Sequence, residues 1–517
     1  MLPEIINSYK TGGAYMSRDK IGLILGIFLF LVLWLMPTPE GMPVEAQSLA
    51  AVATLMAIWW ITEAVPIPAT SMVPIFLFPV LGIMPGAKVT LSYADQLIYL
   101  YMGGFLIAVT MEKWNLHRRI ALHTIRMVGI TPDRIVLGFM VATGFISMWI
   151  SNTAAAMMMV TIALPVLTQV AKSIAESAGN TDDTRPGHFN FGTALMLGVA
   201  YSASIGGLGT LVGTPTNAVF AGMVEKTYGI NISFVEWMKV GVPIAVIMLL
   251  ITWFFLVKVV YPSKFTHLPG GKETIHKEIV SLGRMASEEK WVFVIFASVA
   301  ILWIVRGFIK IEALSMVTDT TIAIGGALLL FLIPSKSRKG EFLLDWKTAV
   351  TIPWDVLLLF GGGFALAQGF GDTGLTTYLA GKLAVLEGTS IVIVIPVVVT
   401  LVVFASELTS NTATNSIMLP IMVALASAMQ VHPYGMMIAS TMAASYAFML
   451  PVGTPPNAIV FATRYVTMNQ MIKAGFWLNI IAIMLISFFV LVMLPLIWGI
   501  DLNTLPTEFA APVTGGG

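Results

Sequence analysis

The same polar cluster, Ser-x-x-x-Ser-Asn-Thr-Ala, occurs twice in this apolar chain, at residues 147–154 and 406–413. Ser, Asn and Thr are favoured at the start of a helix, where free backbone N–H groups can bind an anion such as a carboxylate. The end of the preceding helix offers carbonyl and hydroxyl oxygens, which are suitable ligands for a small cation. Each copy therefore predicts the tip of a helical hairpin that binds an anion and a cation.

A second pair of motifs, Gly-Thr-Pro-x-Asn, follows at residues 213–217 and 453–457. Proline lacks an N–H group and glycine tolerates unusual backbone angles, so each motif predicts a helix that is broken midway. Non-helical backbone within a membrane must line a polar site, because lipid cannot satisfy its hydrogen bonds. One hairpin and one broken helix from each half would form two cation sites that flank one anion site. The two cations would offset the charge of a dianion.

The order of these motifs indicates an internal duplication. The sequence Gly-Gly-Phe at residues 103–105 recurs at 362–364, and the two polar clusters are separated by the same offset of 259 residues. The Gly-Thr-Pro-x-Asn motifs are 240 residues apart, because the first half carries an extra polar loop around residues 172–188. Two homologous halves in a membrane chain are typical of a transporter whose site lies where the repeats meet.

The composition is that of a membrane protein. Of the 517 residues, 57% are hydrophobic and only 11% are charged, whereas soluble domains carry roughly a quarter charged residues. The runs are continuous rather than alternating, so they predict an all-α polytopic membrane protein and not a β-barrel. We expect the chain in the cell membrane. The clearest apolar runs cover residues 21–36, 240–261, 291–305, 322–334 and 480–497.

Several other classes of protein are disfavoured. A net charge of +1 gives no basic surface for nucleic acid, and the absence of cysteine excludes disulfides and thiol chemistry. The six histidines form no metal-spaced pair and lie in polar flanks, so we expect them at the surface. An intramembrane enzyme would need a nucleophile–base pair or a metal site on facing helices, and the sequence offers neither.

The distribution of Lys and Arg predicts how the two halves are inserted. Basic residues precede and follow the first hairpin segment, 132–171, so both of its ends are expected in the cytoplasm. The second segment, 389–430, is nearly bare of basic residues at its ends and should open to the outside. The hairpins would then be re-entrant and the repeat inverted. Two ordinary membrane spans in each segment are the alternative.

The duplicated Ser-Asn-Thr motif, each copy followed by Gly-Thr-Pro-x-Asn, closely resembles the divalent anion/sodium symporter (DASS) family of di- and tricarboxylate transporters. The resemblance extends from Trp59 to about Leu494. It implies a homodimer in the lipid bilayer that works as an elevator, with sodium as the co-transported ion and no organic cofactor. The implied parts are the N-terminal scaffold spans with the start of the first repeat (1–131), the first hairpin and broken helix of the transport domain (132–230), connector and scaffold spans (231–353), the second hairpin and broken helix (354–470), and the last span with the C-terminal tail (471–517).

The resemblance also implies which residues bind sodium and substrate. The first sodium site would comprise Ser147, Ser151, Asn152 and Gly213, and the second Ser406, Thr409, Asn411 and Gly453. The substrate carboxylates would be bound by Asn152, Thr153, Asn411 and Thr412, in a pocket lined by Thr214, Thr454 and Pro455. Glu407, in the second hairpin, has Met148 as its counterpart. We expect Glu407 either to be hydrogen-bonded at a helix end or to help bind a third cation.

The predicted function is sodium-coupled import of a C4 dicarboxylate such as succinate, fumarate or malate. Citrate and sulfate are alternative substrates. An alternative mechanism is dicarboxylate exchange, in which basic residues can replace sodium, but neither hairpin tip contains Lys or Arg. An ion antiporter of the same fold superfamily would need a titratable pair at the centre, where the motifs offer hydroxyls and amides.

Overall fold

The structure is a computed structural model that describes residues 18–129, 131–175, 183–263, 271–308 and 316–509. Within these ranges the chain is helical, and its β structure is limited to an isolated antiparallel bridge between Pro334 and Phe342. The prediction of an all-α fold is therefore confirmed for the described residues.

The helices of the first half lead up to and include the first pair of motifs. In chain order they are α2 (Arg18–Leu35), α3 (Val44–Thr62), α4 (Ile67–Thr70), α5 (Val73–Val80), α6 (Gly86–Tyr93), α7 (Gln96–Lys113), α8 (Leu116–Val128), α9 (Pro132–Ser147), α10 (Asn152–Ala175), α11 (Asn190–Gly207), α12 (Pro215–Tyr228) and α13 (Phe234–Phe254), which continues as a π-helix (Phe255–Val260).

The helices of the second half include the second pair of motifs. They are α14 (Gly271–Ser281), α15 (Ser287–Phe308), α16 (Asp319–Leu332), α17 (Trp346–Ala349), α18 (Trp354–Asp372), α19 (Leu375–Leu383), α20 (Ile391–Ser406), α21 (Asn411–Ala428), α22 (Pro433–Ser445), α23 (Pro455–Ala462), α24 (Met468–Phe488) with a π-helical continuation (Phe489–Met493), and α25 (Leu494–Trp498).

Six described helical segments are long and apolar enough to cross a membrane, and the pair α18 and α19, bent by 71°, is a seventh candidate. The apolar run 322–334 belongs to α16, which has only 14 residues and is therefore about 21 Å long, shorter than a bilayer core. The six segments are Val44–Thr62, Gly86–Lys113, Asn152–Ile174, Phe234–Val260, Ser287–Phe308 and Met468–Trp498.

Helices α11 and α22 are buried on all sides and lie at the centre of the packing. Every residue of α22 is buried, as is every residue of α11 after Asn190. A helix that is apolar all round is expected in the interior of a large protein. α11 packs on α9, and a Cβ atom on Gly206 would clash with the backbone of Gly144, so this close contact requires glycine. In the second half α22 packs on α20 and α21.

Both pairs of motifs lie at interruptions of helices, as predicted. The chain leaves the helical conformation at residues 148–151, between α9 and α10, and at 407–410, between α20 and α21. It does so again at residues 208–214, between α11 and α12, and at 446–454, between α22 and α23. The two helices of each hairpin segment contact each other.

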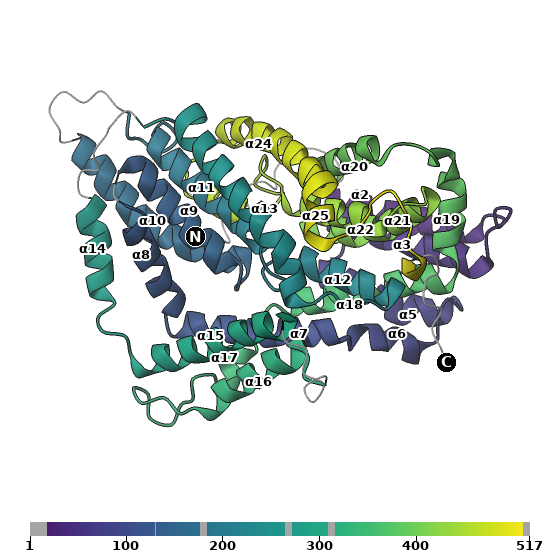
Figure 1. Ribbon diagram of the computed structural model, residues 1–517, viewed down its shortest axis with the longest axis horizontal. Coiled ribbons are helices and arrows are strands. Elements are labelled where there is room, and N and C mark those ends of the chain that lie inside the picture. The colour runs from purple at the N-terminus through teal and green to yellow at the C-terminus, as the bar shows by residue number, and fades with distance from the viewer. Residues whose placement is uncertain (1–17, 130, 176–182, 264–270, 309–315, 510–517) are drawn as a thin grey trace.

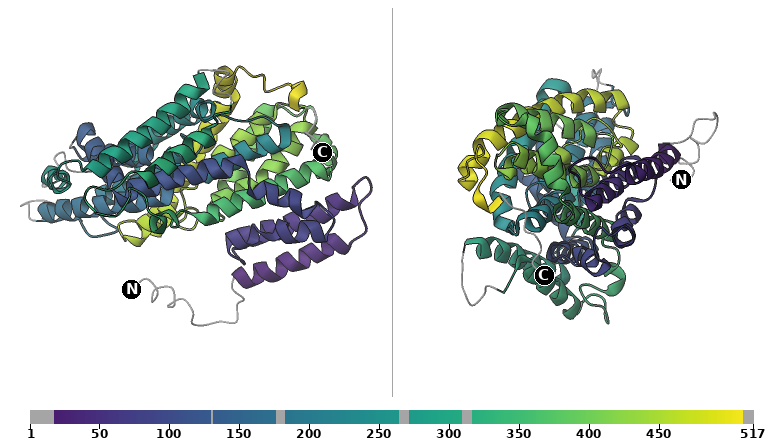
Figure 2. Two further views of the ribbon diagram at one scale, coloured as in Figure 1. Left: turned by 90° about the horizontal axis from the view of Figure 1, so that it is seen from below. Right: turned by 90° about the vertical axis from the view of Figure 1, so that its right-hand side faces the viewer.

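The two hairpin segments lie toward opposite ends of the longest axis of the molecule. Figure 1 shows α9 and α10 near one end and α20 and α21 toward the other, with α12 and α18 below α20 in this view. Figure 2 shows the N-terminal helices, drawn in purple, on the outside of this assembly.

The prediction that all histidines are at the surface is wrong for two of them. His432 is buried and caps α22, where its Nδ1 atom accepts a hydrogen bond from the backbone N–H of Tyr434. His117 is buried against the carbonyl of Met111. His123, His188 and His276 are exposed, and His267 lies outside the described residues.

The topology can be tested by labelling engineered cysteines, because the chain contains none of its own. Lys172, at the end of α10, and Glu387, just before α20, are both exposed. If the repeat is inverted, Lys172→Cys is labelled by a membrane-impermeant maleimide only from the cytoplasm and Glu387→Cys only from outside. Permeabilised cells provide the control for reactivity. Labelling of both positions from the same side would contradict the inverted repeat.

Candidate functional site

The first hairpin tip gathers oxygen atoms around Ser147. The Ser147 hydroxyl lies 2.6 Å from Asn152 Oδ1 and 2.7 Å from the carbonyl oxygen of Ala203 in α11. A hydroxyl has a single proton to donate, so it cannot satisfy both acceptors at once. Three oxygens that approach so closely are a favourable arrangement for a small cation. Ser151 caps α10, and its Oγ atom accepts from the N–H of Ala154 at 3.2 Å.

The break between α11 and α12 lies against this tip. A Cβ atom on Gly213 would clash with the carbonyl oxygen of Gly207 and would lie 3.0 Å from that of Ser147. A Cβ atom on Gly207 would be 2.5 Å from Asn152 Oδ1. Glycine is therefore required at both positions, and its absence of a side chain allows several carbonyl oxygens to converge. The structure brings Ser147, Asn152 and Gly213 together, as the resemblance implied.

The asparagine that ends each Gly-Thr-Pro-x-Asn motif holds the break in shape. Asn217 Nδ2 donates to the carbonyls of Gly207, at 3.1 Å, and Thr210, at 2.7 Å. In the second half Asn457 Nδ2 donates to the carbonyls of Ala447 and Leu450, both at 3.0 Å.

All three positions of the second set follow those of the first by 240 residues, which is the offset of the motifs. The hydrogen bonds of the break are thus repeated as well as its sequence. The role of these two asparagines was not predicted from the sequence, although both belong to the Gly-Thr-Pro-x-Asn motif.

The second tip contains oxygen atoms without protein partners. Ser406 Oγ and Asn411 Oδ1 are buried, and neither has a hydrogen-bond partner among the described residues. Buried polar atoms are seldom left unpaired, so such atoms point to a ligand. Thr409 donates to the carbonyl of Ala405 at 3.0 Å and contacts the hydroxyl of Thr414. A Cβ atom on Gly453 would lie 3.2 Å from the carbonyl oxygen of Glu407, so the second break also meets its tip.

Glu407 binds the backbone of the second break. The residue is 3% exposed, and its carboxylate accepts hydrogen bonds from the N–H groups of Phe448 (2.7 Å), Met449 (2.9 Å) and Leu450 (3.0 Å). A fourth donor, Asn479 Nδ2 of α24, lies at 2.7 Å. Because all four partners are donors, they match the acceptor-only carboxylate. This geometry supports the structural role that was one of the two alternatives for Glu407.

The first half satisfies the equivalent backbone differently. The N–H groups of Leu208 and Gly209 bond to carbonyls of the preceding turn, at 3.3 and 2.8 Å. Met148, the counterpart of Glu407, packs against Gly209, where a Cβ atom would be 2.9 Å from its terminal methyl group. The two breaks thus have the same sequence motif, but different groups accept the hydrogen bonds of their backbone N–H groups.

The hairpins and breaks of the two halves are interleaved. α10, which begins at the first tip, packs on α23, and α21, which begins at the second tip, packs on α12. Asn415 in α21 donates to the carbonyl of Thr216 at 3.0 Å, and the Thr216 hydroxyl lies 2.7 Å from that of Ser445. These residues, which the sequence analysis did not select, connect the halves. No hydrogen bond among the described residues joins Asn152 directly to Asn411.

The remaining implied substrate residues lie at helix starts. Thr153 is in the first turn of α10 and is partly exposed, whereas Thr412, in the first turn of α21, is buried. Thr214 and Thr454 are buried N-cap residues of α12 and α23, with no side-chain cap hydrogen bond of their own. Pro455 begins α23 and is exposed. All five residues are therefore next to helix N-termini, where an anion is stabilised.

One basic side chain reaches the second tip from elsewhere in the chain. The guanidinium of Arg18, at the start of α2, donates to the carbonyl of Leu408 at 2.8 Å and also to the carbonyl of Ile61 in α3. The tip itself contains no Lys or Arg, as noted above, so this contact could not be found from the motif. Arg18 connects the tip to the N-terminal helices through backbone atoms.

The comparisons with known proteins agree on the class of the chain. The family described as "Sodium:sulfate symporter transmembrane region" matches residues 17–503. The sodium-dependent dicarboxylate transporter SdcS of Staphylococcus saprophyticus is 41% identical over 498 residues, which cover 96% of this chain and 95% of that protein. SdcS of Staphylococcus aureus strain USA300 is 44% identical over 492 residues, which cover 95% and 94%.

Two solved transporter structures share the fold at low sequence identity. MtrF of Neisseria gonorrhoeae, described as an antimetabolite efflux pump, has a TM-score of 0.57 at 12% identity and covers 93% of this chain and 96% of its own. The YdaH transporter of Alcanivorax borkumensis has a TM-score of 0.51 at 12% identity and covers 93% and 97%. At this identity the likeness concerns the fold alone.

The role of Glu407 can be tested by Glu407→Gln. An amide has only one acceptor oxygen, and its NH2 group would face a backbone donor, so at least one hydrogen bond to a charged group is lost, at about 1.5–3 kcal/mol. We expect a lower melting temperature for the purified protein in detergent, followed by tryptophan fluorescence. Glu387→Gln, at an exposed site, is the matched control. Equal melting temperatures for both variants would contradict this role.

Proposed function

The chain belongs to the sodium:sulfate symporter family, and from this premise we propose that it imports C4 dicarboxylates together with sodium ions. It is a multi-pass transporter of the plasma membrane and not an enzyme. The single observation that carries the proposal is the pair of oxygen clusters, each formed by one hairpin tip and one helix break. The names of the SdcS relatives, which share over 40% of their residues with this chain, support sodium and a dicarboxylate as the cargo.

The first sodium site consists of Ser147, Ser151, Asn152 and Gly213 in this proposal. The close approach of the Ser147 hydroxyl, Asn152 Oδ1 and the carbonyls of α11 supports it. A sodium ion would coordinate these oxygens directly and relieve their competition for one hydroxyl proton.

The second sodium site consists of Ser406, Thr409, Asn411 and Gly453. The unpaired oxygens of Ser406 and Asn411 support it. No group of three or more His, Asp or Glu residues in the described part of the chain could hold a metal ion, so the two proposed sites rest on neutral oxygen donors. Neutral donors bind sodium weakly enough for release, and two ions together balance a dianionic substrate.

The substrate is bound between the two tips in this proposal. Asn152 and Thr153 donate to one carboxylate and Asn411 and Thr412 to the other, while Thr214, Thr454 and Pro455 line the pocket. The N-termini of α10 and α21 add their free N–H groups and the positive ends of their dipoles. Two anion-binding ends suit a four-carbon diacid such as succinate, fumarate or malate. Citrate and sulfate are the competitors to test.

Transport would follow an elevator mechanism in a homodimer, with residues 132–230 and 354–470 as the moving domain. The interleaved packing of α10 on α23 and of α21 on α12 supports one compact unit that carries both sites. The repeated hydrogen bonds of Asn217 and Asn457 support two related halves, which we propose to be inverted with re-entrant hairpins. An ion antiporter is less favoured, since Glu407, the acidic residue of the second tip, is fully hydrogen-bonded to the protein.

Uptake of labelled succinate into proteoliposomes should require sodium. With two sites to fill, the initial rate should rise more steeply than linearly with external sodium, and it should fall to background when sodium is replaced by potassium or choline. Unlabelled fumarate, malate, citrate and sulfate, added as competitors, rank the substrates.

The same vesicles distinguish symport from exchange. Preloading with unlabelled succinate should not replace the need for external sodium. Uptake that is as fast in potassium as in sodium, and that depends on preloading, would contradict the symporter and establish the exchanger.

Asn152 and Asn411 should each be needed for substrate affinity. Replacement of either by Ala removes an amide donor from a carboxylate, at a cost of about 1–3 kcal/mol, which corresponds to roughly 5- to 150-fold weaker succinate binding. The apparent affinity for succinate is measured at saturating sodium. A variant that also binds sodium more weakly then still has its sodium sites filled. Asn503→Ala, in an exposed turn beside Asp501, is the control. Near-normal affinity in both single variants would rule out this assignment.

A further inference from the structure

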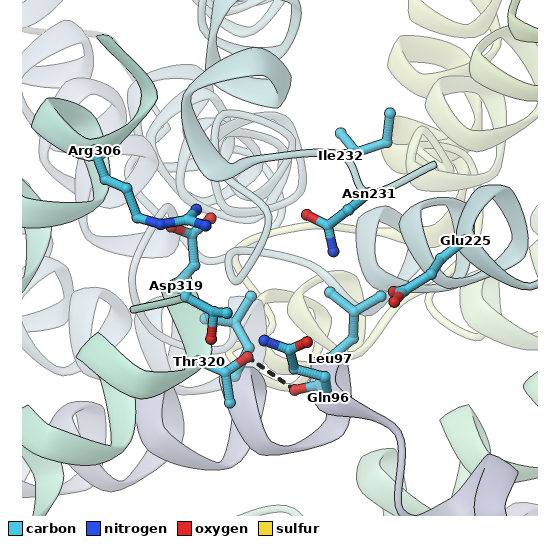
Figure 3. Close-up of a pocket in the computed structure, with 10 residues that line it drawn as sticks. Gln96, Leu97, Glu225, Asn231, Ile232, Arg306, Asp319 and Thr320 are labelled. Carbon is cyan, nitrogen blue, oxygen red and sulfur yellow. Dashed lines mark hydrogen bonds and ion pairs between the residues drawn. The ribbon is translucent and has the colours of Figure 1, made fainter. Parts of the chain in front are cut away.

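A polar cavity of about 320 Å³ lies away from the hairpin tips, between the starts of α7 and α16 and the ends of α12 and α15 (Figure 3). Gln96, Glu225, Asn231, Arg306, Asp319 and Thr320 are among the residues that line it. In Figure 3 the side chains of Glu225, Asn231 and Gln96 point toward the cavity from three different elements. Glu225 lies ten residues after Pro215, which begins α12 at the first break, so about 15 Å of helix separate the cavity from that break.

The basic side chains around the cavity are already paired. Arg306 forms an ion pair with Asp319 at 2.9 Å and donates to the carbonyl of Val317 at 2.6 Å. The second carboxylate oxygen of Asp319 accepts from the N–H of Phe234 at 3.0 Å. Lys226, next to Glu225 in sequence, is paired with Asp95 at 2.7 Å. These two ion pairs are neutral overall.

Glu225, in contrast, forms no ion pair among the described residues. Its Oε2 atom is buried and has no hydrogen-bond partner among the residues that the structure describes, and no ion pair there involves its carboxylate. An unpaired charge within a membrane protein is costly, so such a group is expected to have a partner. The other polar residues that line the cavity, Gln96, Asn231 and Thr320, offer amide and hydroxyl oxygens but no further cation.

We propose that this cavity binds a sodium ion through the carboxylate of Glu225, as a cation site separate from the two at the tips. The inference deepens the proposed function and rests on it for the choice of sodium as the ion. Carboxylate, amide and hydroxyl oxygens are the ligand types that hard cations prefer. Glu407, the earlier candidate for a third ion, already accepts four hydrogen bonds from the protein, so Glu225 is the better candidate.

The position of the cavity relates it to transport. α7 runs from Gln96 at the cavity to Lys113 at its other end, and Arg118, Arg119 and Arg126 follow Lys113. Since basic residues mark the cytoplasmic side, the cavity opens toward the outside. One wall, α12, belongs to the proposed moving domain, whereas α7, α15 and α16 belong to the scaffold. Displacement of α12 would move Glu225 away from the oxygens on the opposite wall of the cavity, so the ion would bind in one conformation and be released in another.

The test measures sodium binding without transport. Leu97 lines the cavity but offers no ligand atom, and Leu97→Cys would be the only thiol in the chain. Alkylation of this variant by N-ethylmaleimide is followed in detergent without substrate. At a sodium concentration about ten times the dissociation constant of the cavity, the cavity is free of sodium about one-tenth of the time. The rate of alkylation should therefore fall about tenfold. Potassium or choline at the same ionic strength should not slow it.

Two double variants decide whether Glu225 is the ligand. L97C/E225Q should react at the sodium-free rate in all salts, whereas L97C/E236Q, altered at an exposed glutamate of α13, should keep its sodium protection. Protection that survives E225Q would overturn the proposal, as would protection by low pH but not by sodium, which would make the occupant a proton. A single symmetric peak in size-exclusion chromatography and a sodium-free rate equal to that of L97C show that the E225Q variant is folded.

This result is independent of uptake. If wild-type proteoliposomes do not take up succinate, the proposed function fails, and the labelling data still show whether the cavity binds sodium. If uptake is sodium-dependent but sodium does not protect L97C, only the cavity site is refuted.

Discussion

Backbone groups released at a helix break inside a membrane must find hydrogen-bond partners in the protein, because lipid offers none. The centre of this molecule depends on that constraint. Asn217 and Asn457 hold the carbonyls of the two breaks, and Glu407 holds three N–H groups of the second. With these groups fixed, the remaining hydroxyl, amide and carbonyl oxygens are free to face a ligand. The proposed binding sites are thus a consequence of how the breaks are stabilised.

The two halves solve this problem with different chemistry. In the first half the helix end bonds to itself and Met148 fills the space beside Gly209. In the second half the carboxylate of Glu407 accepts the hydrogen bonds of the backbone N–H groups at the break. Asn479 of α24 donates a further hydrogen bond to this carboxylate. The second tip therefore carries an acidic side chain close to its proposed cation site, and the first does not. Two sites that look alike in sequence are expected to differ in how strongly they attract an ion.

The positions of the breaks could be predicted from the sequence because the residues that make them act locally. Gly, Pro and the helix-capping residues interrupt a helix wherever they cluster, and the four interruptions lie where the motifs are. The long-range partners could not be predicted in this way. Asn415 donates a hydrogen bond to Thr216, which is 199 residues away in the sequence. Arg18 donates to the second tip, which is 390 residues away. His432 is buried by packing, although it lies in a polar stretch of the sequence. The cavity beside Glu225 combines residues from 96 to 320, and no motif connects them.

The interleaving of α10 with α23 and of α21 with α12 has a consequence for the origin of the fold. Each half forms its own proposed cation site, but the proposed substrate site needs both halves, and each tip helix packs on the break helix of the other half. If the chain arose by duplication and its halves are inverted, as proposed, its half-length ancestor would have bound a dicarboxylate only as a pair of copies inserted in opposite orientations, with two identical cation sites. Such a symmetric pair cannot carry a glutamate on one side and a methionine on the other. The difference between Glu407 and Met148 is then a trait that became available only after gene fusion, when each half could evolve by itself.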